Sequence, residues 1–493
     1  MAERGVVLSL DEGTTGATAV VVGQDGEVRA KGYREIAQHY PQPGWVEHDP
    51  LEIWSAVKLS AKEALHNAGV SAADVRAVGI TNQRETLVLW DRRTLAPISP
   101  AIVWQDRRTA SLCDQLRASG HERRVREVTG LVLDPYFTAT KLAWAIKHVD
   151  GAVDAAVGTV DSWLVARLSN GREHVTDASN ASRTLLFDIS RGEWSQEMAD
   201  LFGVSLANLP RVVDSSGRIS RTDPEVFGGI AAPITGIAGD QQAALFGQAC
   251  TTAGMAKNTY GTGSFVLMQT GADRVDSSSG MLTTVAWRRD DRLSYALEGA
   301  IFITGAALQW LRDGLGIIGS AAEAGPLASS VADSGGVFMV PAFVGLGAPH
   351  WDPYARGTIV GLTRGAGRAE LVRAAVEAMA YQTRDVVEAM EEDAGLAMPE
   401  LRVDGGAAVM DVLCQFQADL LGIPVRRPRH TEATALGAAF LAGLGAGTWN
   451  DADLKGLWMP DREFEPKMSR DEADTLQERW RDAVERSRGW ALH

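Results

Sequence analysis

The sequence predicts an α/β fold built from two similar halves. Segments with the apolar pattern of strands alternate with segments whose apolar residues recur at helical spacing, and no long linker or low-complexity tract interrupts them. A strand, a turn rich in glycine and threonine, and a returning strand occur near the N-terminus and again after residue 250. We therefore expect two halves that face each other through these turns, with a boundary near 247–256.

The first half begins with such a unit and continues into a helix. The turn has the sequence DEGTTG at 11–16, and a second turn at 24–26 leads into a third strand. Asp49 is the expected N-cap of the helix, because Pro50 follows it at the first helical position. Four segments have the apolar character of strands, namely residues 6–10, 17–22, 75–81 and 86–90.

The second half repeats this plan. A turn with the sequence GTGS occupies 261–264, and apolar residues at helical spacing predict a long helix over 369–392. In the tight turn Asp404-Gly405-Gly406, the glycines allow the backbone to approach a neighbouring group or a ligand closely. The predicted strands of this half are residues 254–260, 265–268 and 401–403.

The charge and the cysteines exclude several classes of protein. Lys and Arg number 48 against 63 Asp and Glu, so the net charge is −15. Nucleic acids and anionic membrane surfaces select a basic face, so we expect no nucleic-acid partner and no membrane insertion. The three cysteines lack zinc-ligand spacing and the N-terminus lacks a long apolar run. We therefore expect free thiols and a cytoplasmic location.

The two glycine- and threonine-rich turns are candidate phosphate sites. Their backbone N–H groups can cradle phosphate oxygens, and threonine hydroxyls add donors. Asp11, at the end of a strand, can hold magnesium directly or through water. The alternative for each turn is an ordinary tight turn. No P-loop motif occurs, and the G-x-G-x-x-G at 314–319 follows a helical pattern instead of a strand, so a Rossmann site is not predicted.

Asp240 and the Arg84-Glu85 pair are candidate catalytic and substrate residues. Asp240 opens an apolar helix, either as an ordinary N-cap or as a carboxylate that orients a nucleophilic hydroxyl. A weak base suffices for phosphoryl transfer, which needs positioning and charge neutralisation more than proton removal. Arg84-Glu85 is either an exposed ion pair or a donor and acceptor for vicinal hydroxyls.

Several stretches resemble the glycerol kinase family, a branch of the FGGY carbohydrate kinases. They extend between residues 6 and 445 and include LDEGTTGATAVV, GWVEHDPLEIW, GITNQRET, GIAGDQQAALFGQ and AKNTYGTGSF. The resemblance implies two RNase H-like domains of the actin-like ATPase fold, with ligands bound between them. They would span 1–250 and 251–445, followed by a helical extension over 446–493 that packs on the second domain.

The same resemblance implies an activity and its residues. The reaction is ATP-dependent phosphorylation of glycerol to sn-glycerol 3-phosphate and ADP, the first step of glycerol catabolism, with Mg²⁺, in a homodimer or homotetramer. Asp240 matches the catalytic base, and Asp11 with Asp240 lies near the metal. The implied glycerol contacts are Arg84, Glu85, Trp104, Tyr136, Asp240, Gln241 and Phe265. The implied nucleotide contacts are Thr14, Thr15, Gly16, Thr262, Gly305, Gln309, Gly406 and Met410.

The chain departs from the family pattern in the nucleotide loops. Thr18 stands where an arginine is frequent, Glu12 replaces the commoner glutamine, and Met410 stands where an asparagine usually lies near adenine. We expect weaker ATP binding, because a charge-assisted contact is lost, and looser discrimination between ATP and GTP. Residues 225–232 lack the glycine- and arginine-containing stretch that binds fructose bisphosphate in some relatives. No histidine stands at the loop position that is phosphorylated in other relatives. We therefore expect neither regulation by fructose bisphosphate nor regulation by histidine phosphorylation.

Two alternatives stay open at this point. The chain is a sister FGGY kinase for another small polyol or ketose, or it is a weakly catalytic nucleotide-binding sensor on the same fold. Thr18 and Met410 favour the sensor slightly. Asp11, Arg84, Glu85 and Asp240 argue against it, because a pure binder needs no poised carboxylate.

Overall fold

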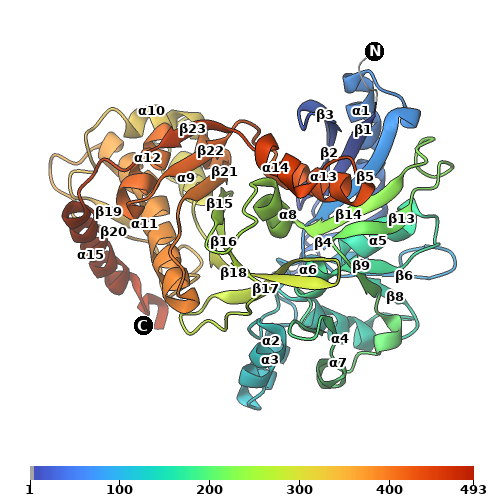
Figure 1. Cartoon of the computed structure of the whole chain (residues 1–493). Helices are drawn as coiled ribbons and strands as arrows, with labels where there is room; N and C mark the ends of the chain where they lie inside the picture. The colour runs from blue at the N-terminus through green and yellow to red at the C-terminus, as the bar shows by residue number, and fades with distance from the viewer. Residues whose placement is uncertain (1–4, 493) are drawn as a thin grey trace.

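Two mixed β-sheets, one in each half of the chain, organise the molecule into two lobes (Figure 1). The structure is a computed structural model, and it describes residues 5–492. The first sheet has the strand order β13-β14-β5-β1-β2-β3. Its strands are β1 (Val6–Glu12), β2 (Gly16–Gly23), β3 (Val28–Glu35), β5 (Val75–Asn82), β13 (Ser216–Arg221) and β14 (Pro233–Gly239).

The predicted strand, turn and strand at the N-terminus are the centre of this sheet. Strand β1 pairs antiparallel with β2 and parallel with β5. The expected strand over 6–10 is confirmed, but it continues to Glu12, so Asp11 lies within the strand and the turn is limited to residues 13–15. Strand pairing on both sides fixes the direction in which the Asp11 side chain points, because register sets the face of every residue.

Helices cover both faces of the first sheet. Helices α1 and α5 share one apolar core with the sheet, and α8 and α13 share another on the opposite face. The predicted cap of α1 is confirmed, because the Asp49 side chain accepts a hydrogen bond from the Leu51 N–H. These helices are α1 (Pro50–Ala68), α5 (Val160–Leu168), α8 (Asp240–Gly247) and α13 (Ala433–Ala446).

The second sheet has the order β17-β18-β16-β15-β21-β22-β23. The long helix predicted over 369–392 is confirmed as α11, which forms a core with α12 and α15. The strands are β15 (Ala256–Tyr260), β16 (Ser264–Gly271), β17 (Leu282–Arg289), β18 (Arg292–Ile301), β21 (Leu401–Gly405), β22 (Val425–Pro428) and β23 (Pro460–Phe464). The helices are α9 (Gly305–Asp313), α10 (Ala324–Ala328), α11 (Arg368–Ala394), α12 (Asp411–Leu421) and α15 (Arg470–Ser487).

Two segments of the second half belong by their contacts to the first lobe. Helix α13 packs on β14, β5 and β1, and Figure 1 shows it beside α8 on the first lobe. The β17–β18 hairpin packs Val285 and Tyr295 against α6 (Ala178–Ala181). Helix α13 thus packs on the first lobe, although all but its last residue lies within the expected second domain, 251–445.

The C-terminal segment also differs from a purely helical extension of the second lobe. Strand β23 joins the second sheet, and α15 packs on α12. Before them, Trp449 donates from Nε1 to the Gln24 carbonyl at 2.6 Å, and Asp451 of α14 (Asp451–Leu457) pairs with Arg289 of β17 at 2.7 Å. The segment thus contacts both lobes.

A helical cluster and short paired strands complete the chain. The cluster has its own apolar core and consists of α2 (Ala110–Ala118), α3 (Glu122–Thr129), α4 (Thr138–His148) and α7 (Gln196–Phe202). The paired strands are β4 (Glu47–His48) with β7 (Ala101–Ile102), β6 (Val88–Trp90) with β8 (Ala156–Gly158), β9 (Val175–Asp177) with β12 (Arg211–Val213), β10 (Phe187–Asp188) with β11 (Glu193–Trp194), and β19 (Phe338–Val340) with β20 (Thr358–Val360).

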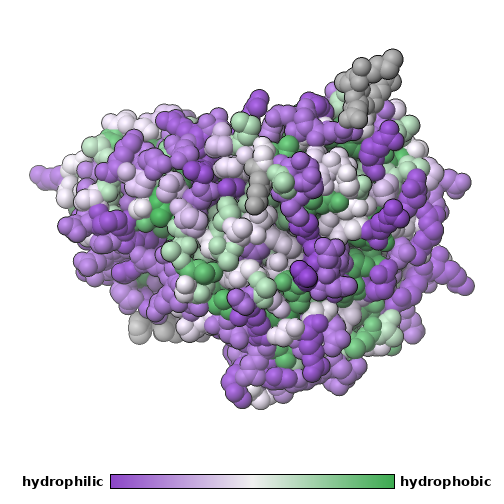
Figure 2. Space-filling model, in the orientation of Figure 1, coloured by the Kyte–Doolittle hydropathy of each residue, from purple (hydrophilic) through white to green (hydrophobic). Residues whose placement is uncertain are grey.

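The face of the molecule seen in Figure 2 is largely hydrophilic, with neutral and apolar side chains gathered mainly towards its centre. Within residues 5–492, no helix combines the length and the apolar character needed to cross a membrane.

Candidate active site

Asp240 stands at the junction between β14 and α8. Gly239 is the N-cap of α8 and Asp240 is the first helical residue, so the expectation that Asp240 is the N-cap is wrong by one position. The half-buried carboxylate accepts the Gln241 N–H at 2.7 Å, and its Oδ1 lies 3.0 Å from Arg84 Nε. A side chain at Gly239 would lie 2.7 Å from the Arg84 stem, so glycine at this position lets Arg84 reach Asp240.

Arg84 and Glu85 are buried, and the alternative of an exposed ion pair is wrong. Arg84 is 3% and Glu85 1% exposed. Arg84 Nη1 lies 2.5 Å from one carboxylate oxygen of Glu298, and its Nη2 donates to the other at 3.2 Å. Nη2 also donates to the Tyr136 hydroxyl at 3.4 Å. Glu85 has a φ of 63°, a strained conformation for a non-glycine residue, as is found at functional sites.

The carboxylates around Arg84 titrate differently. Burial raises the pKa of Glu85 despite the nearby Arg84 and Arg183 guanidiniums. Burial also opposes the ionisation of Glu298, but Arg183 and Arg84 outweigh it and lower the pKa of Glu298 to about 2. Glu298 is therefore a permanent anion that holds two cations. Sequence reasoning missed Glu298 and Arg183, because both lie far from Arg84 in the chain.

Three aromatic side chains surround the Arg84 group. Trp104 and Tyr136 meet edge to face with ring centroids 5.5 Å apart, and the Arg84 guanidinium lies 5.8 Å from the centroid of the Phe265 ring. Trp104 Nε1 donates to Thr14 Oγ1 at 2.9 Å, which ties this group to the first turn. The structure thus brings the predicted glycerol contacts together, and rings beside hydroxyl-binding groups suit a small carbon backbone.

Lys257 is a site residue that sequence reasoning missed. Its ammonium donates to Gln241 Oε1 and, at 2.8 Å, to Thr259 Oγ1. Burial lowers the pKa of Lys257 to about 8, although Asp404 and Asp240 oppose this shift. A lysine within a predicted apolar strand, 254–260, is the signal that points to it.

Asp11 provides the observation that tests the fit of a metal. Burial, together with the nearby carboxylates of Asp240 and Glu432, raises the pKa of Asp11 to about 8. Within residues 5–492, no group of three or more His, Cys, Asp or Glu side chains has the arrangement of a metal cage. Mg²⁺ usually takes one or two carboxylates together with substrate phosphates and water. The carboxylates of Asp11 and Asp240, which are close enough to interact electrostatically, fit that pattern.

The second turn lies against the start of α9. Gly305 is the first residue of α9, and its N–H donates to the Gly261 carbonyl at 3.1 Å. A Cβ at Gly305 would lie 2.5 Å from that carbonyl oxygen, so this approach requires glycine. The Thr262 carbonyl accepts from the N–H groups of Thr304 and Ala306 at 2.9 and 3.0 Å. Thr262 and Gln309 are exposed, and their side chains are available to a ligand.

The third turn follows β21 beside the second. Tyr260 of β15 is the register partner of Gly405 of β21, so Gly406 lies next to the turn that begins at Gly261. Gly406 is exposed, with no atom within 4 Å of the position of a Cβ. Met410, the other residue predicted to contact the nucleotide here, is 8% exposed and lies close to Gly325 in the second core. Its contact with the nucleotide stays a prediction.

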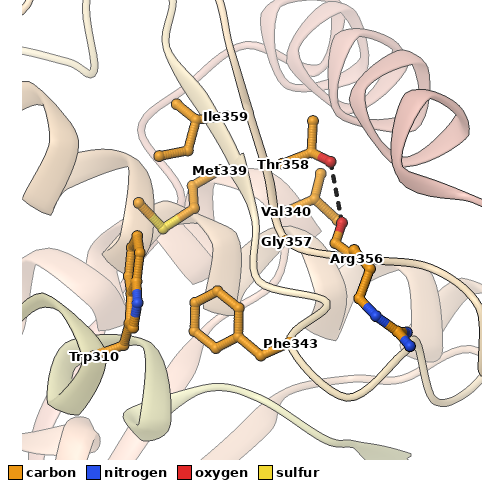
Figure 3. A pocket seen from close by; sticks show the side chains of 8 residues that line it. All are labelled: Trp310, Met339, Val340, Phe343, Arg356, Gly357, Thr358 and Ile359. Atoms are coloured by element: carbon orange, nitrogen blue, oxygen red, sulfur yellow. Dashed lines mark hydrogen bonds between the residues drawn. The ribbon is translucent and has the colours of Figure 1, made fainter. Parts of the chain in front are cut away.

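A separate pocket of about 480 Å³ lies in the second lobe (Figure 3). The rings of Trp310 and Phe343, with centroids 5.0 Å apart, form one wall with Met339. Figure 3 shows the Arg356 side chain directed away from this apolar lining. No predicted site residue lines the pocket, so the polar constellation around Asp240 is the candidate active site.

Comparisons with known proteins agree with this geometry. The models of the FGGY family of carbohydrate kinases match residues 6–247 with the N-terminal domain and 256–446 with the C-terminal domain. The chain is 56% identical to glycerol kinase of Dechloromonas aromatica (strain RCB), over 98% of each chain. It is 54% identical to glycerol kinase 2 of Thermotoga maritima, over 98% of this chain and 99% of the relative. Its fold matches the crystal structure of Plasmodium falciparum glycerol kinase with ADP, with a TM-score of 0.92 and 34% identity over 98% of each chain.

Proposed function

The chain belongs to the FGGY family of carbohydrate kinases, and we propose that it transfers the γ-phosphoryl group of ATP to glycerol, giving sn-glycerol 3-phosphate and ADP. The observation that carries the proposal is the identity of more than half of the residues with curated glycerol kinases over nearly the whole chain. The cluster of Arg84, Glu85 and Asp240 beside aromatic rings supports a small polyhydroxy substrate.

In the proposed reaction, Asp240 orients the terminal hydroxyl of glycerol. The hydroxyl oxygen bonds to the γ-phosphorus, the bond from that phosphorus to the β–γ bridging oxygen breaks, and the hydroxyl proton passes to Asp240. Arg84 Nε, 3.0 Å from Asp240 Oδ1, keeps the carboxylate directed towards the substrate. Proton acceptance by a positioned side chain accounts for about 10²- to 10⁴-fold in rate.

The nucleotide is assigned to the glycine- and threonine-rich turns. Backbone N–H groups of residues 13–16 and of the turn at 261–263 are proposed to contact the phosphates, with Thr262, Gly305, Gln309 and Gly406 on the nucleotide side. Asp11 and Asp240 would hold Mg²⁺, which when bound neutralises phosphate charge. The half-buried Trp104–Thr14 contact supports a shared site, because it joins the first turn to the glycerol group.

Glycerol-dependent formation of ADP tests the proposed function. Asp240→Asn keeps the shape of the side chain and removes the proton acceptor, so kcat falls about 10²- to 10⁴-fold. Asp313→Asn, a change of the same kind at an exposed residue of α9, serves as the matched control and keeps wild-type kcat. If the wild type forms no ADP with glycerol but does so with dihydroxyacetone or xylulose, the proposed substrate is wrong.

We also propose the assembly and the location of the enzyme. A homodimer or homotetramer is proposed, and light scattering on the purified protein measures it. A cytoplasmic location is supported by Cys113, Cys250 and Cys414, which are free and buried, because reducing compartments keep thiols in that state. The domain limits 1–250, 251–445 and 446–493 are also proposed, and the family matches at 6–247 and 256–446 support the first two.

A further inference from the structure

Four buried charged side chains form a closed ring beside the proposed glycerol site. We call Arg84, Glu298, Arg183 and Glu85 the four-charge ring. Arg84 contacts Glu298 at 2.5 and 3.2 Å, and Arg183 Nη2 donates to Glu298 at 2.9 Å. Arg183 Nε donates to Glu85 at 2.7 Å, and Glu85 lies 3.8 Å from Arg84 Nε. Two cations and two anions therefore balance each other in a place where none is more than 3% exposed.

The ring joins distant parts of the chain. Arg84 and Glu85 follow β5 of the first sheet, and Arg183 follows α6. Glu298 lies on β18, a strand of the second sheet, whose hairpin packs against the first lobe. Arg84 and Glu85 are proposed to touch glycerol, whereas Glu298 and Arg183 lie behind them. The second sheet thus supplies a side chain that supports a substrate residue of the first.

We propose that Glu298 and Arg183 are positioning residues, which set the directions in which Arg84 and Glu85 present their polar atoms to a substrate with adjacent hydroxyl groups. This inference rests on the proposed glycerol kinase function and goes beyond it, because neither residue is assigned to the site by the motifs of the sequence.

The donor geometry of Arg84 supports this role. A guanidinium has five N–H donors in a rigid plane. Glu298 accepts one bond from each terminal nitrogen, which fixes that plane. Nη1 also reaches Gln242 Oε1 at 3.3 Å. A remaining donor on Nη2 bonds to the Tyr136 hydroxyl, and Nε lies 3.0 Å from Asp240 Oδ1. Tyr136 and Asp240 are both proposed to contact glycerol.

Arg183 holds Glu85 in a corresponding way. Its Nε donates to Glu85 Oε1, and its Nη1 is buried without a partner in the structure. Its guanidinium lies 5.7 Å from the Tyr136 ring centroid and 5.3 Å from that of Phe137. These rings and the two carboxylates fix Arg183, which in turn fixes Glu85 in its strained conformation.

The test uses Glu298→Asp in the full-length protein. This variant keeps the charge balance of the ring but retracts the carboxylate, so the bidentate contact with Arg84 is lost. We expect the KM for glycerol to rise about 10- to 100-fold, the range for a charged hydrogen bond, while the KM for ATP stays within about twofold. The preference for glycerol over 1,2-propanediol and 1,3-propanediol, measured as a ratio of kcat/KM, falls with it.

Glu377→Asp is the matched control. Glu377 is also a buried glutamate that pairs with an arginine, Arg373, at 2.6 Å, but it lies on α11 within the second core. The Glu377→Asp variant should have a lower melting temperature but an unchanged KM for glycerol and an unchanged preference for glycerol over the two diols. A Glu298→Asp enzyme with wild-type glycerol KM, or with glycerol and ATP KM values raised in parallel, overturns the inference.

A second variant keeps the inference testable if Glu298→Asp does not fold. Arg183→Lys keeps the charge but loses the bridge between Glu85 and Glu298, and the same selective rise in the glycerol KM is expected. Unchanged glycerol KM in Arg183→Lys refutes the inference. Failure of the proposed function is distinct, because then the wild type itself forms no glycerol-dependent ADP.

Discussion

The contact between α8 and α13 determines where Asp240 stands, and Gly437→Ala perturbs it directly. A Cβ at Gly437 would lie 1.8 Å from the Ala243 carbonyl oxygen, whereas ordinary contacts begin near 3.4 Å. The two helices must therefore separate by about 1.6 Å, the difference between 3.4 and 1.8 Å. A Cβ at Gly247 of α8 would likewise lie 2.0 Å from the Ala433 carbonyl oxygen. The two helices are therefore in close contact on both sides, and no alternative packing is available without movement of the backbone.

The expected effects follow from that displacement. Ala243 lies one turn from Asp240 on α8, so a shift of the helix moves the carboxylate. A misplacement of about 1 Å costs on the order of 10²-fold in rate, and we expect kcat to fall by about that factor. Overpacking of a close contact costs about 1–3 kcal/mol, so the melting temperature also falls.

Steady-state formation of ADP and thermal unfolding measure the two effects. Gly456→Ala is the matched control, because no atom lies within 4 Å of its Cβ position in α14, and alanine favours a helix. The control should keep wild-type kcat and an equal or higher melting temperature. Wild-type kcat and melting temperature in Gly437→Ala would show that α13 does not hold α8 in place.

Three further predictions concern single side chains. Trp104→Phe removes the hydrogen bond to Thr14, so kcat/KM for glycerol should fall about fivefold, the equivalent of roughly 1 kcal/mol; an unchanged value counts against this contact. Thr18 is the register partner of Asp11, so Thr18→Arg places a cation beside that carboxylate. The KM for ATP in steady-state assays should fall as a result. A KM that stays the same or rises contradicts the hypothesis that Thr18, in place of an arginine, weakens ATP binding. Burial and, to a smaller extent, the nearby carboxylate of Asp177 raise the pKa of Asp161 from 3.8 to about 7. The contribution of Asp161 to stability is full below pH 3.8 and is lost as the pH rises through 7. Chemical denaturation between pH 5 and 8 should therefore show the free energy of unfolding of the wild type falling by about 2–3 kcal/mol relative to that of Asp161→Asn. Equal pH profiles for the two proteins would refute this prediction.

Local patterns predicted the local structure well. The cap at Asp49, the helix α11 and the strand, turn and strand at the N-terminus each depend on neighbours in the sequence, and each is found where the pattern indicates. Motif resemblance also gathered the residues that the fold brings together around Arg84.

Features that depend on distant partners were not predictable. Arg84 is buried because Glu298, more than two hundred residues later, neutralises it, and no local pattern carries that information. The packing of helix α13, late in the chain, against the first sheet was not predictable from its position in the sequence. The burial of Met410 in the second core was likewise not predictable from its place in a motif.

The return of α13 to the first lobe has a consequence for synthesis on the ribosome. Helix α8 is complete once residue 247 has been made, but the helix that covers its glycine and alanine face ends at residue 446 of 493. During the translation of the intervening 199 residues, the nascent first lobe exposes that face. Arg84 also lacks its partner Glu298 until residue 298 has been made. The first lobe therefore cannot complete its native core until residue 446 has been made, and chaperones that shield apolar surfaces on nascent chains have an opportunity to act in this interval.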